Sequence, residues 1–500
     1  MAAVRIAVIA MVLVLLGACA NYNTSAYRKD AAAQVVDAQN GYTLQFVEAD
    51  DEGWLYQPGQ ATKAIDAVRD SVKEKDTFVV LFVHGWHHSA QCCDDNVEGF
   101  KETLTRLHQE LARPGFRQAR DGAEDFRLIG IYVSWRARSL PSWLDYFSFW
   151  GRKSAAERIA EVDLREFLNR LNRVYRDQNR PTEARAADNG PAGASSSAAR
   201  NFLGLVTIGH SFGGQLVLRT VSASLEQELE ELNPAPGYLH ERWTIGPPSQ
   251  PTPAPRAVRG FGDLVILVNP AVEAAAYQKL NVLSRGMTYP QVQTPVMLTV
   301  SADNDKPRHG LFTWGRILGE WFTSKPYKPD LTERESERQA LGVWGPNGVQ
   351  VTHRLQPIDA QMSLIATQKK HTPEPLCPSN VPCECTWYEW RSAPTRTEPD
   401  SLSWSAGASL TDKLSNYDFS ARTVFDNVVL EPQQGSQPYQ PFIVTSATPN
   451  LIDGHSGIFS GPFIDFLMHY IGFVEGKEYL LASEGRGSKH TAAPRRGAAQ

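Results

Sequence analysis

The chain has only six cysteines and no large excess of charge of one sign. The formal net charge of -5, with no Lys/Arg cluster on a predicted helix, argues against a nucleic-acid partner. No internal repeat of the kind that builds solenoids is present either. With 42% hydrophobic and 10% aromatic residues, the 500-residue chain can bury a large globular core.

The N-terminus carries an apolar run, Ile6 to Leu16, that is too short for an ordinary membrane span but has the length found in signal peptides. Arg5 supplies the positive charge that precedes such a run. The segment ends in Leu16-Gly17-Ala18-Cys19, which resembles the lipobox of bacterial lipoproteins. The alternative is a plain secretory signal whose cleavage site happens to contain a cysteine.

The lipobox resemblance implies that residues 1–18 are a signal peptide and that the thiol of Cys19 receives a lipid anchor. Ala20 is not the aspartate that retains such lipoproteins at the inner membrane, so the expected location is the bacterial cell envelope, at the outer membrane. Several acyl chains together hold a protein stably at a bilayer, where one chain would not.

Export would place the remaining cysteines in an oxidising compartment where disulfides form. Their odd number leaves at least one thiol free or paired elsewhere, and the pairing cannot be deduced from the sequence. Neither the C-terminal trio nor the cluster after residue 86 has the spacing of a zinc motif, so no metal site is predicted. The residues concerned are Cys377, Cys383 and Cys385, and His87, His88, Cys92, Cys93, Asp94 and Asp95.

Six apolar runs rich in β-branched and aromatic residues predict strands that are buried on both faces. Helical periodicity between them predicts helices, and strands that alternate with helices favour an α/β fold with a mostly parallel sheet. The predicted strands are Phe78–Val83, Phe126–Trp135, Phe202–Ile208, Leu264–Val268, Val296–Val300 and Pro441–Thr445, and the predicted helices are Leu164–Tyr175, Gln215–Leu232 and Pro462–Tyr470.

Composition also predicts how the chain is divided into a lead-in, a folded domain with insertions, and a tail. Residues 19–75 are expected to form the anchor cysteine, a tether and an irregular or helical lead-in, and residues 76–482 the folded domain. Pro-, Gly- or Ser-rich stretches near 181–200, 233–258 and 324–405 are expected to be insertions, the last of them a small subdomain over one end of the sheet. The Gly-, Ala- and Arg-rich end, 483–500, is expected to be a disordered tail.

One pentapeptide carries the clearest chemical signal, Gly209-His210-Ser211-Phe212-Gly213. This G-x-S-x-G sequence lies between a predicted buried strand and a predicted helix, which is the context of a nucleophile elbow. Glycines are needed there because the serine occupies a tight, strained turn. The motif resembles the elbow of lipases and esterases in the α/β-hydrolase superfamily, and the resemblance spans about Phe78 to Phe473 with insertions.

The superfamily resemblance implies roles for residues elsewhere in the chain. An upstream strand of the superfamily ends in a His-Gly turn, matched here by His84-Gly85-Trp86, so the backbone N–H groups of Trp86 and Phe212 are the expected oxyanion hole. The base is expected to be a histidine after the last strand. His455 lies in a polar, Gly-containing loop at that place, whereas His469 falls in a predicted helix and His490 in the tail.

Three carboxylates are candidates for the acid that orients the histidine. Asp305 is preferred because superfamily members usually leave a few residues between the strand end and the acid. Asp303 in the same loop is the close rival, and Glu273 fits the less common arrangement with the acid one strand earlier. Any of the three could instead cap a helix or a turn.

These residues predict a serine hydrolase, similar to carboxylesterases and lipases, that cleaves a small-molecule or lipid ester through an acyl-enzyme without metal or organic cofactor. An acyltransferase or amidase with the same triad is the first alternative. The second is a surface lipoprotein that kept the fold but only binds a ligand.

Overall fold

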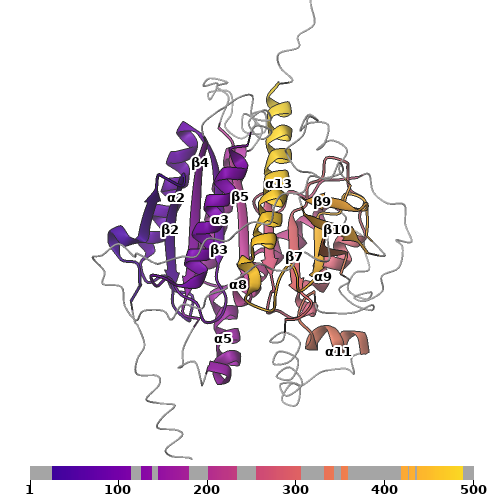
Figure 1. Cartoon of the computed structure of the whole chain (residues 1–500), viewed down its shortest axis with the longest axis horizontal. Helices are drawn as coiled ribbons and strands as arrows, with labels where there is room; N and C mark the ends of the chain where they lie inside the picture. The colour runs from indigo at the N-terminus through magenta and orange to yellow at the C-terminus, as the bar shows by residue number, and fades with distance from the viewer. Residues whose placement is uncertain are drawn as a thin grey trace, which may run out of the picture.

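The computed structural model describes residues 25–113, 126–137, 145–179, 201–232, 255–305, 331–342, 351–358, 418–425, 427–433 and 436–487. Helices and strands alternate along most of this chain (Figure 1). The strands are β1 (Gln34–Asp37), β2 (Tyr42–Ala49), β3 (Asp76–Val83), β4 (Phe126–Trp135), β5 (Leu203–His210), β6 (Leu264–Val268), β7 (Met297–Ala302), β8 (His353–Pro357), β9 (Thr423–Phe425), β10 (Val428–Pro432) and β11 (Phe442–Ala447). The α-helices are α2 (Pro58–Glu74), α3 (Asp95–Leu111), α5 (Asp145–Ile159), α6 (Asp163–Asn179), α8 (Phe212–Leu232), α9 (Ala274–Arg285), α11 (Leu331–Arg338) and α13 (Gly461–Gly487), and two 3₁₀ turns are η2 (Asp30–Ala33) and η4 (Gly457–Phe459).

The strands described form one eleven-stranded sheet in the order β1-β2-β4-β3-β5-β6-β7-β11-β8-β10-β9. Pairing is parallel from β2 through to β8, whereas β1, β10 and β9 pair antiparallel at the two edges. The carboxyl ends of the parallel strands therefore meet at one edge of the sheet, where open α/β sheets bind their ligands.

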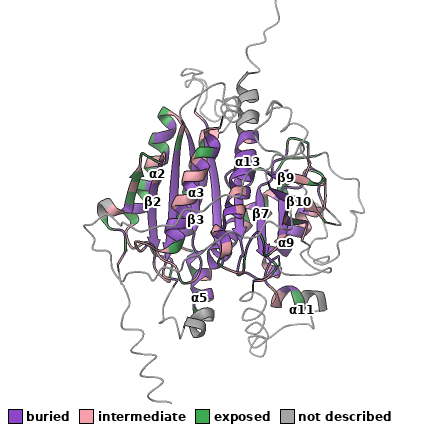
Figure 2. Cartoon of the chain, viewed as in Figure 1, coloured by how far each residue is buried: buried purple, intermediate pink, exposed green. Residues whose placement is uncertain are grey.

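Apolar side chains that point alternately to the two faces of the strands form a hydrophobic core on each side of the sheet. In β3, Val79 and Leu81 belong to one core and Val80 and Phe82 to the other, because successive side chains point to opposite faces. The first core is completed by residues of α2, α5, α6, α8 and α9, and the second by residues of α3 and α13. Figure 1 shows α13 running across one face of the sheet, and Figure 2 shows the central strands in the colour of buried residues.

All six predicted strands are present, and two of them, β4 and β6, have the predicted bounds. The predicted helices correspond to α6, α8 and α13, each of which extends beyond the predicted range. The architecture is thus α/β with a mostly parallel mixed sheet between helices.

The folded domain begins before residue 76, the start predicted from the sequence. The segment described as an irregular or helical lead-in contains β1 and β2, and β2 pairs with β4 over its full length. Burial of Leu44 and Phe46 in the second core ties this segment to the sheet.

The predicted insertion at 324–405 also contributes to the sheet itself, since β8 lies within it and pairs with β11 and β10. At the C-terminus, α13 extends to Gly487, so the boundary predicted for the tail at residue 483 falls inside a helix. Several predicted features lie outside the described residues: the signal peptide, Cys19, the insertion at 181–200, residues 233–254 of the insertion predicted at 233–258, the C-terminal cysteines Cys377, Cys383 and Cys385, and His490.

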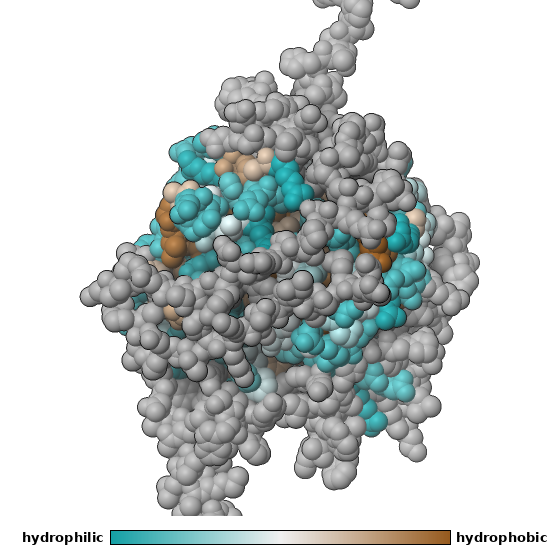
Figure 3. Space-filling view, viewed as in Figure 1, coloured by the Kyte–Doolittle hydropathy of each residue, from teal (hydrophilic) through white to brown (hydrophobic). Residues whose placement is uncertain are grey.

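The described surface in Figure 3 is mostly hydrophilic, with small separate hydrophobic areas. Among the helices that the structure describes, none combines the length and the apolar character that a bilayer-spanning segment requires.

Candidate active site

The turn between β5 and α8 holds Ser211 in a left-handed conformation, with a φ of 56°. This conformation is uncommon for a residue with a side chain and is retained where surrounding structure imposes it. The Ser211 N–H donates to the carbonyl oxygen of Val268 at 3.0 Å, and its own carbonyl oxygen accepts from the N–H of Ala271 at 3.0 Å. The turn is thereby fixed to the end of the neighbouring strand, β6.

Glycine at position 213 is required by a close approach of two backbones. A Cβ there would lie 2.1 Å from the carbonyl oxygen of Val83, which cannot move without breaking β3. The second glycine of the G-x-S-x-G motif is therefore required because a side chain at position 213 would clash with the backbone of β3.

Ser211, His455 and Asp305 form a chain of hydrogen bonds. The Oγ atom of Ser211 lies 2.7 Å from Nε2 of His455, and Nδ1 of His455 lies 2.7 Å from Oδ2 of Asp305. Asp305 is fully buried, whereas the His455 side chain retains 18% of its exposure. The three residues come from the end of β5, the loop after β7 and the loop after β11, all at the carboxyl edge of the parallel strands.

The other two carboxylates that the sequence offered as the acid have different partners. Asp303 pairs with Arg354 at 3.4 Å on the surface. Glu273 precedes α9 and forms a buried ion pair with Lys153 at 2.9 Å. Asp305 is thus the one of the three that contacts His455.

The rival histidine within the described residues, His469, is also engaged elsewhere. It lies in α13, where Nδ1 donates to the carbonyl oxygen of Asp465 at 2.7 Å. It therefore lies within a helix, as the sequence predicted.

Phe212 directly follows Ser211 and Trp86 lies in the loop after β3; their N–H groups are the ones that the sequence predicts for the oxyanion hole. Phe212 is the first residue of α8, where N–H groups have no partner within the helix and favour negative charge. The loop after β3 approaches so closely that a Cβ on Gly85 would lie 2.7 Å from Cβ of Ser211. The Trp86 and Phe212 rings are 6.4 Å apart between centroids, so both residues border the same site.

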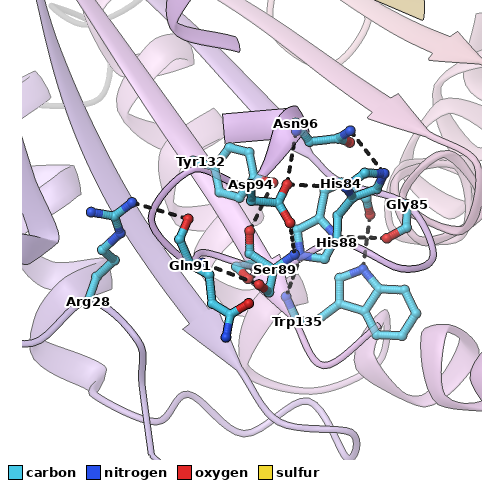
Figure 4. A network of polar contacts seen from close by, with 11 residues as sticks. Arg28, His84, Gly85, His88, Ser89, Gln91, Asp94, Asn96, Tyr132 and Trp135 are labelled. Carbon is cyan, nitrogen blue, oxygen red and sulfur yellow. Dashed lines mark hydrogen bonds and ion pairs between the residues drawn. The ribbon is translucent and has the colours of Figure 1, made fainter. Parts of the chain in front are cut away.

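His84 binds both the loop after β3 and the end of β4, through Gly85 and Trp135 (Figure 4). Its Nδ1 donates to the carbonyl oxygen of Gly85 at 2.8 Å, while Nε2 accepts from the Trp135 N–H at 3.1 Å. Complete burial lowers the pKa of His84 to about 4, so the ring is neutral at ordinary pH and keeps this pattern of one donor and one acceptor.

Asp94 fixes the far end of the same loop, at the start of α3 (Figure 4). Its carboxylate accepts from the N–H groups of Ser89 and Asn96 and contacts Nδ1 of His88 at 3.1 Å. Burial alone would raise the pKa of Asp94, but the adjacent His88 and these hydrogen bonds hold it below the usual value. A charged cap of this kind stabilises both the helix start and the loop.

Arg28 ties the N-terminal segment to this loop. Its Nε donates to the carbonyl oxygen of Ala90 at 2.7 Å, and its guanidinium lies over the Phe46 ring, 4.5 Å from the centroid. This contact could not be predicted from the sequence, because a lone arginine gives no signal of which distant residues it will bind.

The cysteines after Trp86, Cys92 and Cys93, are both disulfide-bonded. His88, which the sequence places in the same cluster, contacts Asp94 as described above. Within the described ranges no three His, Cys, Asp or Glu side chains are arranged to hold a metal ion.

Two further polar residues lie at the site and were not predicted to have a role there, His210 and Asn269. Both are buried and both donate to the backbone carbonyl oxygen of His455, at 3.0 Å each. Burial, followed by the neighbouring His455, holds the pKa of His210 well below its usual value, so His210 is a neutral donor. The position of Asn269 directly after a buried strand was the available signal.

Comparison of the chain with protein-family models, with curated proteins and with solved structures finds no match. The case for a function therefore rests on the geometry of this site.

Proposed function

We propose that the protein is a serine hydrolase of the α/β-hydrolase superfamily that cleaves carboxylic esters. The observation that carries the proposal is the Ser211–His455–Asp305 chain of hydrogen bonds, with 2.7 Å at each contact. The order serine, acid, histidine along the chain and the strand-turn-helix at Ser211 are those of the superfamily. The loop after β3 also lies against the nucleophile, as an oxyanion loop does in that fold.

In the proposed mechanism His455 accepts the Ser211 proton on Nε2 while Oγ attacks the ester carbonyl carbon. Asp305 keeps the proton on Nδ1 of His455 and stabilises the imidazolium. The N–H groups of Trp86 and Phe212 donate to the oxyanion of the tetrahedral intermediate. His455 then protonates the leaving alcohol, and water, deprotonated by the same ring, releases the acid from the acyl-enzyme. The chemistry requires no metal and no organic cofactor.

A fluorophosphonate probe tests the proposal directly, because it phosphonylates only an activated serine. The full chain in detergent should acquire one adduct, located on Ser211 by peptide mass spectrometry, and should hydrolyse p-nitrophenyl esters. Both reactions should disappear in Ser211→Ala, whereas Ser222→Ala, which removes a hydroxyl bonded to the Leu218 carbonyl in α8, should keep them. Ester turnover that persists in Ser211→Ala would end the proposal.

The same assay separates the alternatives. Labelling at Ser211 without ester turnover would favour an acyltransferase or amidase, which uses the same acyl-enzyme with another acceptor or leaving group. A folded protein that is not labelled would instead favour a binding lipoprotein.

We further propose that a lipid anchor at Cys19 holds the enzyme at the outer membrane, where its substrate is a small-molecule or lipid ester. The support is the lipobox-like sequence Leu16-Gly17-Ala18-Cys19. In a bacterial host, radioactive palmitate should be incorporated into the full chain and should not be incorporated into Cys19→Ala. The Cys19→Ala protein should be recovered without detergent, and equal labelling of the two proteins would contradict the anchor.

A further inference from the structure

We propose that Asn269 is a positioning residue of the triad: its buried amide holds the loop of His455 against the strand end that leads to Asp305. The inference rests on the proposed hydrolase function. Asn269 is fully buried and follows β6, one residue after the strand ends.

The side chain of Asn269 uses both ends of its amide. The Nδ2 group donates to the carbonyl oxygens of Gly454 and His455, at 3.2 and 3.0 Å. The Oδ1 atom accepts from the N–H of Ala302 at 2.8 Å. Ala302 is the last residue of β7, from which the chain continues to Asp305. One side chain therefore joins the base-carrying loop to the acid-carrying strand.

The backbone around Asn269 completes the link to the nucleophile. Its N–H donates to the carbonyl oxygen of Val300 at 2.7 Å, and the residue before it, Val268, accepts from the N–H of Ser211. Asn269 itself has a φ of 45°, a conformation that asparagine adopts more readily than most residues with a side chain. The end of β6 thus lies at the junction of all three triad segments.

The loop of His455 is also held from its other sides. His210 donates from Nε2 to the same carbonyl oxygen of His455, and Asn304 binds the N–H of Gly454 through Oδ1 at 2.8 Å. Asn304 also donates to Asp453 at 2.8 Å. Asn304 thus holds the loop from the segment of Asp305 itself, whereas Asn269 holds it from the end of β6 and also binds the end of β7.

The contacts explain why this position suits asparagine. A carboxylate at 269 could still accept from the N–H of Ala302, but it would present lone pairs to the carbonyls of Gly454 and His455. An apolar side chain would remove the hydrogen bonds that Asn269 makes to these buried backbone groups, and the His455 carbonyl oxygen would keep the one from His210. Misplacement of a catalytic group by about 1 Å can cost about 100-fold in rate, so a residue that sets the His455 loop affects kcat without contacting substrate.

The test uses Asn269→Gly in the full chain in detergent, because glycine accepts a φ of 45° without strain and only the amide is lost. Thr220→Val is the matched control: it removes one buried side-chain hydrogen bond, to the Leu216 carbonyl, from the helix that follows Ser211. We expect Asn269→Gly to lower kcat for an ester about 10- to 100-fold with KM within about twofold. Thr220→Val should keep the wild-type kcat.

Proton NMR supplies a readout that does not depend on turnover. The proton that His455 shares with Asp305 should give a far-downfield resonance, assigned by its loss in His455→Ala and Asp305→Asn. That resonance should be broadened or lost in Asn269→Gly and kept in Thr220→Val. A kcat equal to that of Thr220→Val together with an unchanged resonance would overturn the positioning role.

Asn269→Asp, which has the same size, is the second variant in case the glycine protein fails to fold. It keeps the acceptor for Ala302 and loses both donors to the loop, so the same loss of kcat and of the resonance is expected. If the wild-type chain neither turns over esters nor reacts with the fluorophosphonate, the hydrolase proposal fails. The resonance then still decides whether Asn269 positions His455.

Discussion

Replacement of Asp305 by asparagine is expected to lower kcat by about four orders of magnitude while the protein stays folded. The amide group would donate to Nδ1 of His455, which Asp305 Oδ2 now contacts at 2.7 Å. The ring would then hold its proton on Nε2, facing Ser211, and could not accept the serine proton. Kinetics with a p-nitrophenyl ester and the rate of fluorophosphonate labelling measure the loss, and near-UV circular dichroism reports the fold.

Two matched variants make this prediction specific to Asp305. Asp303→Asn disrupts a surface pair with Arg354, and Glu273→Gln disrupts the pair with Lys153, so both should retain kcat within a few-fold. The sequence offered these same three residues as the acid, and the kinetics choose among them independently of the geometry. Retention of the wild-type kcat in Asp305→Asn, with a loss in one of the other two variants, would remove Asp305 from the mechanism.

Protein stability is expected to depend on a group of buried and partly buried carboxyls at the amino end of β6. Asp263, before β6, accepts from the Leu205 N–H at 2.6 Å and from the Tyr175 hydroxyl. Glu475 of α13 is 2% exposed, and its Oε2 atom has no hydrogen-bond partner within the described part of the chain. Glu478 accepts from the hydroxyl of Thr294.

Of these three carboxyls, Glu475 has the fewest hydrogen bonds that would stabilise a negative charge, so it is the one that we expect to be protonated. Burial, followed by the charges of Asp263 and Glu478, raises the pKa of Glu475 well above the usual value. The cation beside it in sequence, Lys477, donates instead to the carbonyl oxygens of Gln291 and Gln293.

The sign of the pH effect follows from this raised pKa. The folded protein keeps a proton on Glu475 that the unfolded chain releases above its ordinary pKa of about 4.5, so the folded state binds more protons. Stability from this group is therefore present at low pH and is lost as pH rises through the raised pKa. Each unit of difference between the folded and unfolded pKa corresponds to about 1.4 kcal/mol once the pH exceeds both.

Glu475→Gln should accordingly become more stable relative to wild type as pH rises from 5 to 8, measured by urea unfolding at several pH values. The comparison with wild type is needed because buried histidines act in the opposite direction: burial lowers the pKa of His84 and of His353 to about 4. The control Glu231→Gln changes the same group at an exposed position on α8. A stability difference from wild type that stays constant with pH would contradict a proton on Glu475.

The sequence identified those parts of the fold whose signal is local. Strands such as β4 and β6 lie in continuous apolar runs, and such runs are buried on both faces wherever the sheet places them. β1 and β10 were missed because they are short, mix polar with apolar residues and are defined by antiparallel partners at the sheet edges. Their pairing depends on contacts that no local window contains.

The strand-turn-helix at Ser211 could be predicted from the sequence alone, because the strand, the glycine-flanked serine and the helix that form it are adjacent in the chain. The sequence also placed His455 and three possible acids in loops at strand ends. Only the tertiary structure brought His455, 244 residues beyond Ser211, into contact with it and selected Asp305, 150 residues before His455, as its partner. The contacts of Asn269 were likewise visible only in the tertiary structure. Parallel strands bring residues that are distant in sequence to one edge of the sheet, and the hydrogen bonds between those residues depend on this proximity and leave no local sequence pattern.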